Sequence, residues 1–173
     1  MAEAETIENP NVVEIEEFAR DMMEFVGNAY LSCPRRDTSC YSPFRIEMGE
    51  TVLRFVSYFE HFLSVISKIV TKEMEERKMT LDEFAQILIN NIAKDFPFLE
   101  LIFICSIIGL ISIDHFKMEN IDTACKLIAL CFGHFEERFQ AEGGWPNFYL
   151  YCQTYLTVLS ELIGDQRTPR DVL

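Results

Sequence analysis

Glycine, histidine and basic residues are scarce in this sequence, and each shortage argues against a class of function. The 173 residues include seven glycines, no glycine-rich phosphate loop, and three scattered histidines, none of which stands near a serine or cysteine in a known nucleophile signature. We therefore expect no enzymatic activity and no cofactor. Fifteen basic against 28 acidic residues give a net charge of −13, which repels nucleic acids and anionic membrane surfaces. Nucleic acid is therefore not an expected partner.

The six cysteines follow no metal-binding pattern. There is no C-x-x-C and no recurring Cys/His spacing, so we expect no metal site. Cys105 and Cys131 lie in apolar runs and are interpreted as small core residues, whereas Cys33 and Cys40 flank a loop and would pair only under oxidation. No basic stretch followed by an apolar one marks a secretory signal, so reduced thiols and a cytoplasmic location are expected.

The longest apolar run, Phe96–Ile113, has Glu100 as its only charge and Pro97 at a position suited to the first turn of a helix. Such a helix would nearly cross a bilayer, at about 1.5 Å per residue. The run is short for a membrane span, however, and Asp114 follows it directly. A helix that is apolar all round also forms the centre of an all-α protein, and we favour that interpretation.

Elsewhere, apolar residues recur every three or four positions, which is typical of amphipathic helices. Thr80 and Glu83 form a capping box, and Gly143-Gly144 allows a tight helix exit. We expect a charged, solvated segment over 72–79 and a break near Ser64–Ser67, because a helix from Phe44 or Arg45 would otherwise be unusually long. The helices are expected over 10–31, 44–71, 81–95, 96–113, 121–140 and 145–163.

Several stretches resemble the Bcl-2 (B-cell lymphoma 2) family of apoptosis regulators. In EERFQAEGGWPNFYLY, the order Glu142, Gly143-Gly144-Trp145 and Phe148 is similar to the second homology motif of the family. Leu53–Leu63 is similar to the third-homology (BH3) helix, Phe84–Leu88 to the start of the helix that lines the groove, and Ser106–Ile113 to the central helix of invertebrate members. The resemblance covers about residues 12–163 and is patchy.

The resemblance implies an all-α, Bcl-2-like helical bundle in which about six or seven amphipathic helices surround the central apolar helix. It implies one domain over residues 1–173, with flexible ends at 1–10 and 165–173. Residues 165–173 are polar, so no integral membrane anchor is expected in this chain.

One motif of the family is missing. The first homology motif, Asn-Trp-Gly-Arg, supplies an arginine that pairs with an aspartate of the ligand helix, and here Phe98–Leu101 or Ile104–Ser106 stands in its place. Losing a charge-assisted hydrogen bond at a buried site costs about 1.5–3 kcal/mol. Lys94 or Arg54 could supply another cation. Such divergence is similar to that of viral members of the family.

The function implied by the resemblance is that of a pro-survival protein, possessing an apolar groove that binds the BH3 helices of pro-apoptotic proteins of the BH3-only and Bax/Bak types. This would place it in the cytoplasm, recruited to mitochondria through its partners. Periodicity alone would predict that each of these groove residues is an ordinary core residue. The groove residues implied are Val56, Phe59, Leu63, Ile66, Phe84, Ile87, Leu88, Ile92, Phe98, Leu101, Gly144, Trp145 and Phe148.

Three alternatives stay open at this point. With a closed groove, the same fold could serve as an adaptor that modulates innate-immune signalling through its surface, which the missing arginine favours. The fold could instead form pores through its central hairpin, which the lack of a C-terminal anchor disfavours. Because Leu53–Leu63 resembles a ligand, one chain could also occupy the groove of another and form a homodimer. The sequence does not determine which BH3 ligands would bind.

Overall fold

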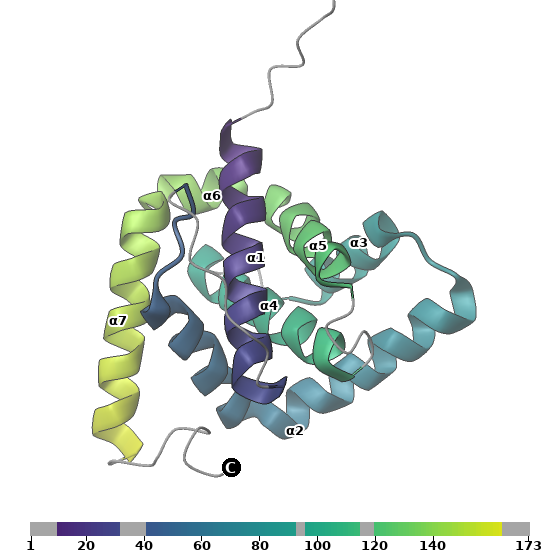
Figure 1. Ribbon diagram of the computed structural model, residues 1–173, viewed down its shortest axis with the longest axis horizontal. Helices are drawn as coiled ribbons and strands as arrows, with labels where there is room; N and C mark the ends of the chain where they lie inside the picture. The colour runs from purple at the N-terminus through teal and green to yellow at the C-terminus, as the bar shows by residue number, and fades with distance from the viewer. Residues whose placement is uncertain (1–9, 32–40, 93–95, 115–119, 164–173) are drawn as a thin grey trace, which may run out of the picture.

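The computed structural model describes residues 10–31, 41–92, 96–114 and 120–163, to which the following account is confined. These residues form seven helices and no strand (Figure 1). Pro10 begins the first helix, as predicted, although it was also counted in the expected flexible end 1–10; the remainder of both expected flexible ends lies outside the described residues. The helices are α1 Pro10–Leu31, α2 Ile46–Arg77, α3 Leu81–Asn91, α4 Pro97–Asp114, α5 Ile121–Gly133, α6 Glu136–Ala141 and α7 Gly144–Ile163.

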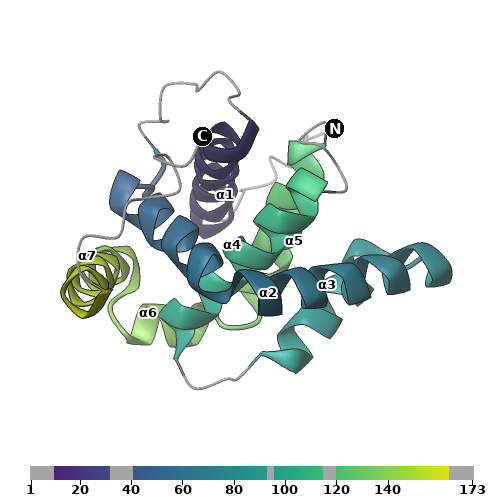
Figure 2. The ribbon, with the colours of Figure 1, turned by 90° about the horizontal axis from the view of Figure 1, so that it is seen from below.

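The apolar helix α4 lies in the interior, with α1, α2, α5 and α6 packed around it (Figures 1 and 2). It is long and apolar enough to cross a membrane, but 72% of that stretch is buried inside the protein. Pro97 lies in the first turn, as predicted, where its missing N–H breaks no helical hydrogen bond. The all-α class and the buried central helix are therefore confirmed.

Two glycines let α1 lie close to its neighbours. A Cβ atom at Gly49 of α2 would stand 2.7 Å from Cε1 of Phe25, so the Phe25 ring of α1 packs directly on the backbone of α2. A Cβ atom at Gly109 of α4 would stand 3.2 Å from Cγ1 of Val26. Because neighbouring residues of α1 contact two different helices in this way, α1 fixes the spacing of both.

The prediction of a break near Ser64–Ser67 was wrong, whereas the charged segment over 72–79 is solvated, as predicted, although residues 72–77 are helical. The helix continues to Arg77 and departs from helical geometry at Phe59, where φ is −108° and ψ is 19°. Residues 72–77 are helical because Lys, Glu, Met and Arg are good helix formers, and Nζ of Lys72 lies 3.7 Å from Glu76 one turn on. Lys78 then ends the helix in the left-handed conformation, with φ of 49°.

The single helix expected over 121–140 is two helices. The N–H of His134 donates to the carbonyl of Cys131 at 3.1 Å, which tightens the end of α5, and α6 begins after Phe135. The backbone of Phe135 leaves helical geometry while its ring is buried 5.3 Å from the ring of Phe132. The core contact of Phe135 and the weak helix propensity of Gly133 together account for the break.

The predicted helix start at Thr80 and the predicted helix exit at Gly143-Gly144 are confirmed. The Thr80 hydroxyl accepts from the N–H of Glu83, and the Glu83 carboxylate accepts from the N–H of Thr80 at 2.8 Å. Gly143 and Gly144 have φ of +103° and +61°, a backbone region that favours glycine. Their turn directs the chain from α6 into α7.

Candidate functional site

The structure separates the thirteen predicted groove residues by burial. Phe59 is 43% exposed, and Ile66, Ile87, Ile92 and Trp145 are half-buried. The buried residues are Val56, Leu63, Phe84, Leu88, Phe98, Leu101, Gly144 and Phe148. In this conformation only Phe59 and the four half-buried residues could contribute appreciable surface to a ligand. The eight buried residues support them from the core.

The exposed side chain of Phe59 connects to α4 through Phe55. The rings of Phe55 and Phe59 lie 4.7 Å apart, and Phe55 meets Phe103 of α4 edge-on at 6.3 Å. Phe103 is half-buried, and Leu99, one turn before it, is 40% exposed. Apolar surface therefore continues from the kink of α2 onto the first half of α4.

The helices α2 and α3 pack on different partners. The helix α3, whose buried residues include Phe84 and Leu88, packs mainly on α5. The helix α2 packs mainly on α4 and α7. Figure 2 shows α2 and α3 from below, with α4 and α5 behind them. The half-exposed Ile66 of α2, Ile87 of α3 and Ile92 just after α3 thus belong to elements held by different parts of the bundle. Two such elements can form the walls of a site for a helix.

The Trp145 ring lies in a cluster of aromatic side chains that come from several helices. It is 4.6 Å from Phe18 of α1, stacked 5.7 Å from Phe132 of α5, and edge-on to Phe139 of α6 at 4.9 Å. Its ring contacts within the described ranges are thus with α1, α5, α6 and Phe148 of its own helix. The structure therefore does not show Trp145 beside the exposed residues of α2 and α3.

An ion pair joins the central helix to α6. Nη1 and Nη2 of Arg138 donate to the two carboxylate oxygens of Glu100 at 2.9 and 2.8 Å, and the Glu100 side chain is 4% exposed. These hydrogen bonds hold the pKa of Arg138 above its usual value. The Arg138 side chain is 43% exposed, but its guanidinium group is committed to Glu100. No spacing rule links positions 100 and 138, so the sequence alone offered no signal of this pair.

The structure gives no decisive replacement for the missing arginine. Glu100, which lies within one of the stretches that stand in place of the family motif, carries the opposite charge and is matched by Arg138. Arg54 is partly exposed on α2, and Lys94 lies outside the described residues.

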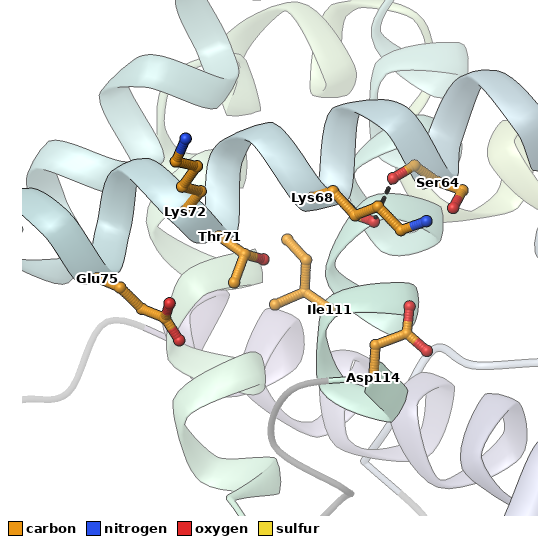
Figure 3. A pocket seen from close by; sticks show the side chains of 8 residues that line it. Ser64, Lys68, Thr71, Lys72, Glu75, Ile111 and Asp114 are labelled. Carbon is orange, nitrogen blue, oxygen red and sulfur yellow. Dashed lines mark hydrogen bonds between the residues drawn. The ribbon is translucent and has the colours of Figure 1, made fainter.

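A hollow of about 500 Å³ lies between α2 and the end of α4 (Figure 3). Six of its lining residues belong to α2, and Ile111 and Asp114 of α4 stand opposite. Because its charges are mixed and none of its residues is a predicted groove residue, it does not match a site for an apolar helix. The lining residues are Ser64, Ser67, Lys68, Thr71, Lys72, Glu75, Ile111 and Asp114.

Four cysteines are free thiols buried in the core. Burial raises the pKa of Cys125, Cys131 and Cys152 to about 12, and raises that of Cys105 further. A thiol with a raised pKa stays protonated and is a poor nucleophile. The core placement of Cys105 and Cys131 is confirmed, and the pair at 33 and 40 lies outside the described residues. In the portion of the chain that the structure describes, no three His, Cys, Asp or Glu side chains are arranged to hold a metal ion.

Sequence reasoning missed an apolar surface on the outside of α2, which we call the α2 stripe: Tyr58, Phe62, Val65 and Ile69. These side chains are 44–56% exposed. Periodicity left open whether Phe62 or Leu63, and Ile69 or Val70, faced inward; the structure buries Leu63 and Val70. The spacing of four, three and four residues was visible in the sequence, but it does not reveal which face is covered.

Together these features define the class of protein: a helical bundle around one apolar helix, with apolar surface on α2, α3 and α4. No protein-family model, curated protein or solved structure matches the chain. A Bcl-2-like arrangement of these helices is therefore a proposal.

Proposed function

We propose that this protein is a diverged, Bcl-2-like inhibitor of apoptosis that sequesters pro-death proteins by binding their BH3 helix. The observation on which the proposal depends is the partial exposure of apolar side chains on two separately packed elements, Phe59 and Ile66 on α2 and Ile87 and Ile92 on and just after α3. The resemblance of the homology stretches to the Bcl-2 family adds to it. The protein would act in the cytoplasm and reach mitochondria through its partners.

Helix-in-groove recognition depends on apolar anchors of the ligand that enter pockets between two walls. Burial of an aliphatic or aromatic side chain contributes about 1.5–3 kcal/mol, so a few anchors supply most of the affinity. The buried Val56, Leu63 and Leu88 would then set the positions of the contact residues from below. Because Glu100 is already paired with Arg138, the ligand's aspartate would contribute less than in a protein with a free arginine at this position.

The test is calorimetric titration of the purified protein with BH3 peptides of about 25 residues, enough for several helical turns that carry the anchors. At least one peptide should bind with submicromolar affinity. An Asp→Ala version of that peptide measures whether any cation of this protein pairs with the ligand carboxylate.

A charged side chain in the proposed surface should prevent binding. We expect Ile87→Arg to abolish the heat of binding, because it places a guanidinium group where an apolar anchor would pack. Leu150→Arg is the matched control: Leu150 is 56% exposed on α7, outside the proposed surface, and this variant should bind normally. Circular dichroism must show both variants folded. Silence across the peptide panel from a folded, helical protein would refute the proposal.

A second candidate function is a Bcl-2-fold adaptor that modulates innate-immune signalling without binding BH3 helices. The burial of eight of the thirteen predicted groove residues favours it, since a closed surface offers a ligand few anchor sites. In that case Ile87→Arg would leave the inhibition of signalling in a cell assay intact, and the wild-type protein would not protect cells from BH3-induced death.

A further inference from the structure

The α2 stripe has the spacing of a helix-pairing seam. Beyond the kink at Phe59, Phe62, Val65 and Ile69 recur at intervals of three and four residues, which is the spacing of the a and d positions of a coiled coil, and Tyr58 lies just before the kink. From Phe62 to Ile69 the stripe extends about 10 Å along the helix, at about 1.5 Å per residue. All four side chains are exposed, so the seam is available without any unfolding of the bundle.

The N-terminal end of α2 is covered by α7. The Thr51 hydroxyl oxygen lies 3.3 Å from the carbonyl oxygen of Cys152, and the Tyr149 hydroxyl donates to Glu47 at 3.3 Å. Beyond the kink at Phe59, α2 runs in a different direction from α7 (Figure 1). Phe62, Val65 and Ile69 lie on this second part of α2, and their side chains are exposed.

We propose that a second copy of this protein covers the α2 stripe, with its own α2 antiparallel to the first. The argument for a second copy is local charge. Residues 54–77 carry four basic and four acidic side chains, so this segment is neutral although the whole chain has a charge of −13. Another copy is therefore repelled least at this segment.

The order of these charges selects the antiparallel arrangement. Arg54 lies in the first part of the segment, whereas Glu73, Glu75 and Glu76 lie at its end together with Lys72 and Arg77, and Glu60 and Lys68 lie on opposite sides of its middle. A parallel pair would place like charges together, and an antiparallel pair places basic beside acidic side chains. With a two-fold axis between Phe62 and Val65, Phe62 of each copy would lie against Val65 of the other copy.

This arrangement differs from insertion of one chain's Leu53–Leu63 into the groove of another. Leu53, Val56 and Leu63 are at most 7% exposed in their own core, so that exchange would require α2 to leave the bundle. Pairing through the α2 stripe leaves each bundle intact. It would also cover the neighbouring Phe59 and Ile66, so, if the proposed function holds, self-association competes with BH3 binding.

Sedimentation velocity of the full chain alone, from about 1 to 500 µM, tests the pairing independently of any BH3 ligand. Small interfaces are typical of weak association, and we expect a reversible dimer with Kd of about 10–100 µM. Phe62→Arg and Ile69→Arg should weaken association at least tenfold. Leu162→Arg, at a residue of α7 that is 76% exposed, is the matched control and should associate like the wild type.

The proposal is overturned if the wild type stays monomeric to 500 µM, or if both stripe variants associate as it does. Orientation has its own test. In the Arg54→Lys variant, a zero-length carbodiimide should join position 54 to Glu75 or Glu76. Along one helix these positions lie about 30 Å apart, so such a cross-link must join two copies. A dimer without this cross-link would show that the antiparallel order is wrong.

Discussion

Removing Arg138 tests whether the ion pair between α4 and α6 stabilises the bundle. Arg138→Met keeps much of the aliphatic stem but leaves the Glu100 carboxylate, 4% exposed, without its two hydrogen bonds. Breaking a buried pair by removing one partner costs about 3–5 kcal/mol. The exposed side of Arg138 lets water reach the site, and the first turn of α4 favours a negative charge by about 0.3–1 kcal/mol. We therefore expect a loss of about 2–3 kcal/mol.

Urea unfolding followed by circular dichroism measures this loss as a lower midpoint at unchanged slope. Glu137→Met is the matched control, because Glu137 is an exposed neighbour on the same helix, and its midpoint should stay near that of the wild type. Adding Glu100→Gln to Arg138→Met removes the uncompensated charge and should restore at least 1 kcal/mol. A loss below 0.5 kcal/mol for Arg138→Met, or strict additivity of the two changes, would refute the reasoning.

Three further predictions concern the packing, the thiols and a helix start. Gly49→Ala should destabilise the protein by about 1–3 kcal/mol in thermal unfolding, because its Cβ would overlap the Phe25 ring. Gly109→Ala should change stability by less than about 1 kcal/mol. Equal effects of the two substitutions would contradict the close packing of Phe25 on Gly49. Thiols of the unfolded chain ionise from pH about 8.5, whereas burial raises the pKa of Cys125, Cys131 and Cys152 to about 12, so their contribution to stability should be full below pH 8.5 and be lost progressively as the pH rises toward about 12, less steeply in Cys131→Ala. Thr80→Ala should cost about 1 kcal/mol and speed amide exchange at the start of α3; unchanged exchange would argue against the capping box.

The sequence predicted those features that depend on local chemistry. Pro97, the capping box at Thr80 and the glycine pair before Trp145 each act through their own backbone, and all three lie where expected. The buried central helix was predictable as well, because the eighteen residues Phe96–Ile113 carry one charge and have few alternatives to burial in a folded chain.

Features that depend on distant contacts were not predictable. The helix α2 departs from helical geometry at Phe59, whose ring packs on Phe55 beside Phe103 of α4, and not at the small residues Ser64–Ser67. The end of α5 is likewise accompanied by burial of the Phe135 ring. In both places tertiary packing overrides local propensity.

The candidate site was predicted only in part for the same reason. Periodicity placed apolar residues on α2 and α3 but could not choose between Phe62 and Leu63 as the buried one. The guanidinium of Arg138 and the carboxylate of Glu100 are 38 positions apart in sequence, and only the folded chain brings them together. The resemblance to a family supplied the groove hypothesis, and periodicity did not.

The burial of α4 has a consequence for synthesis of the protein. Its neighbours come from both sides in sequence: α1 and α2 precede it, while α5, α6 and Phe148 of α7 follow it. A ribosome adding about 5–20 residues per second would need several seconds to reach Ile163 after completing α4. During that interval the most apolar stretch of the chain lacks its C-terminal cover, so chaperones and membranes compete with folding for the nascent protein.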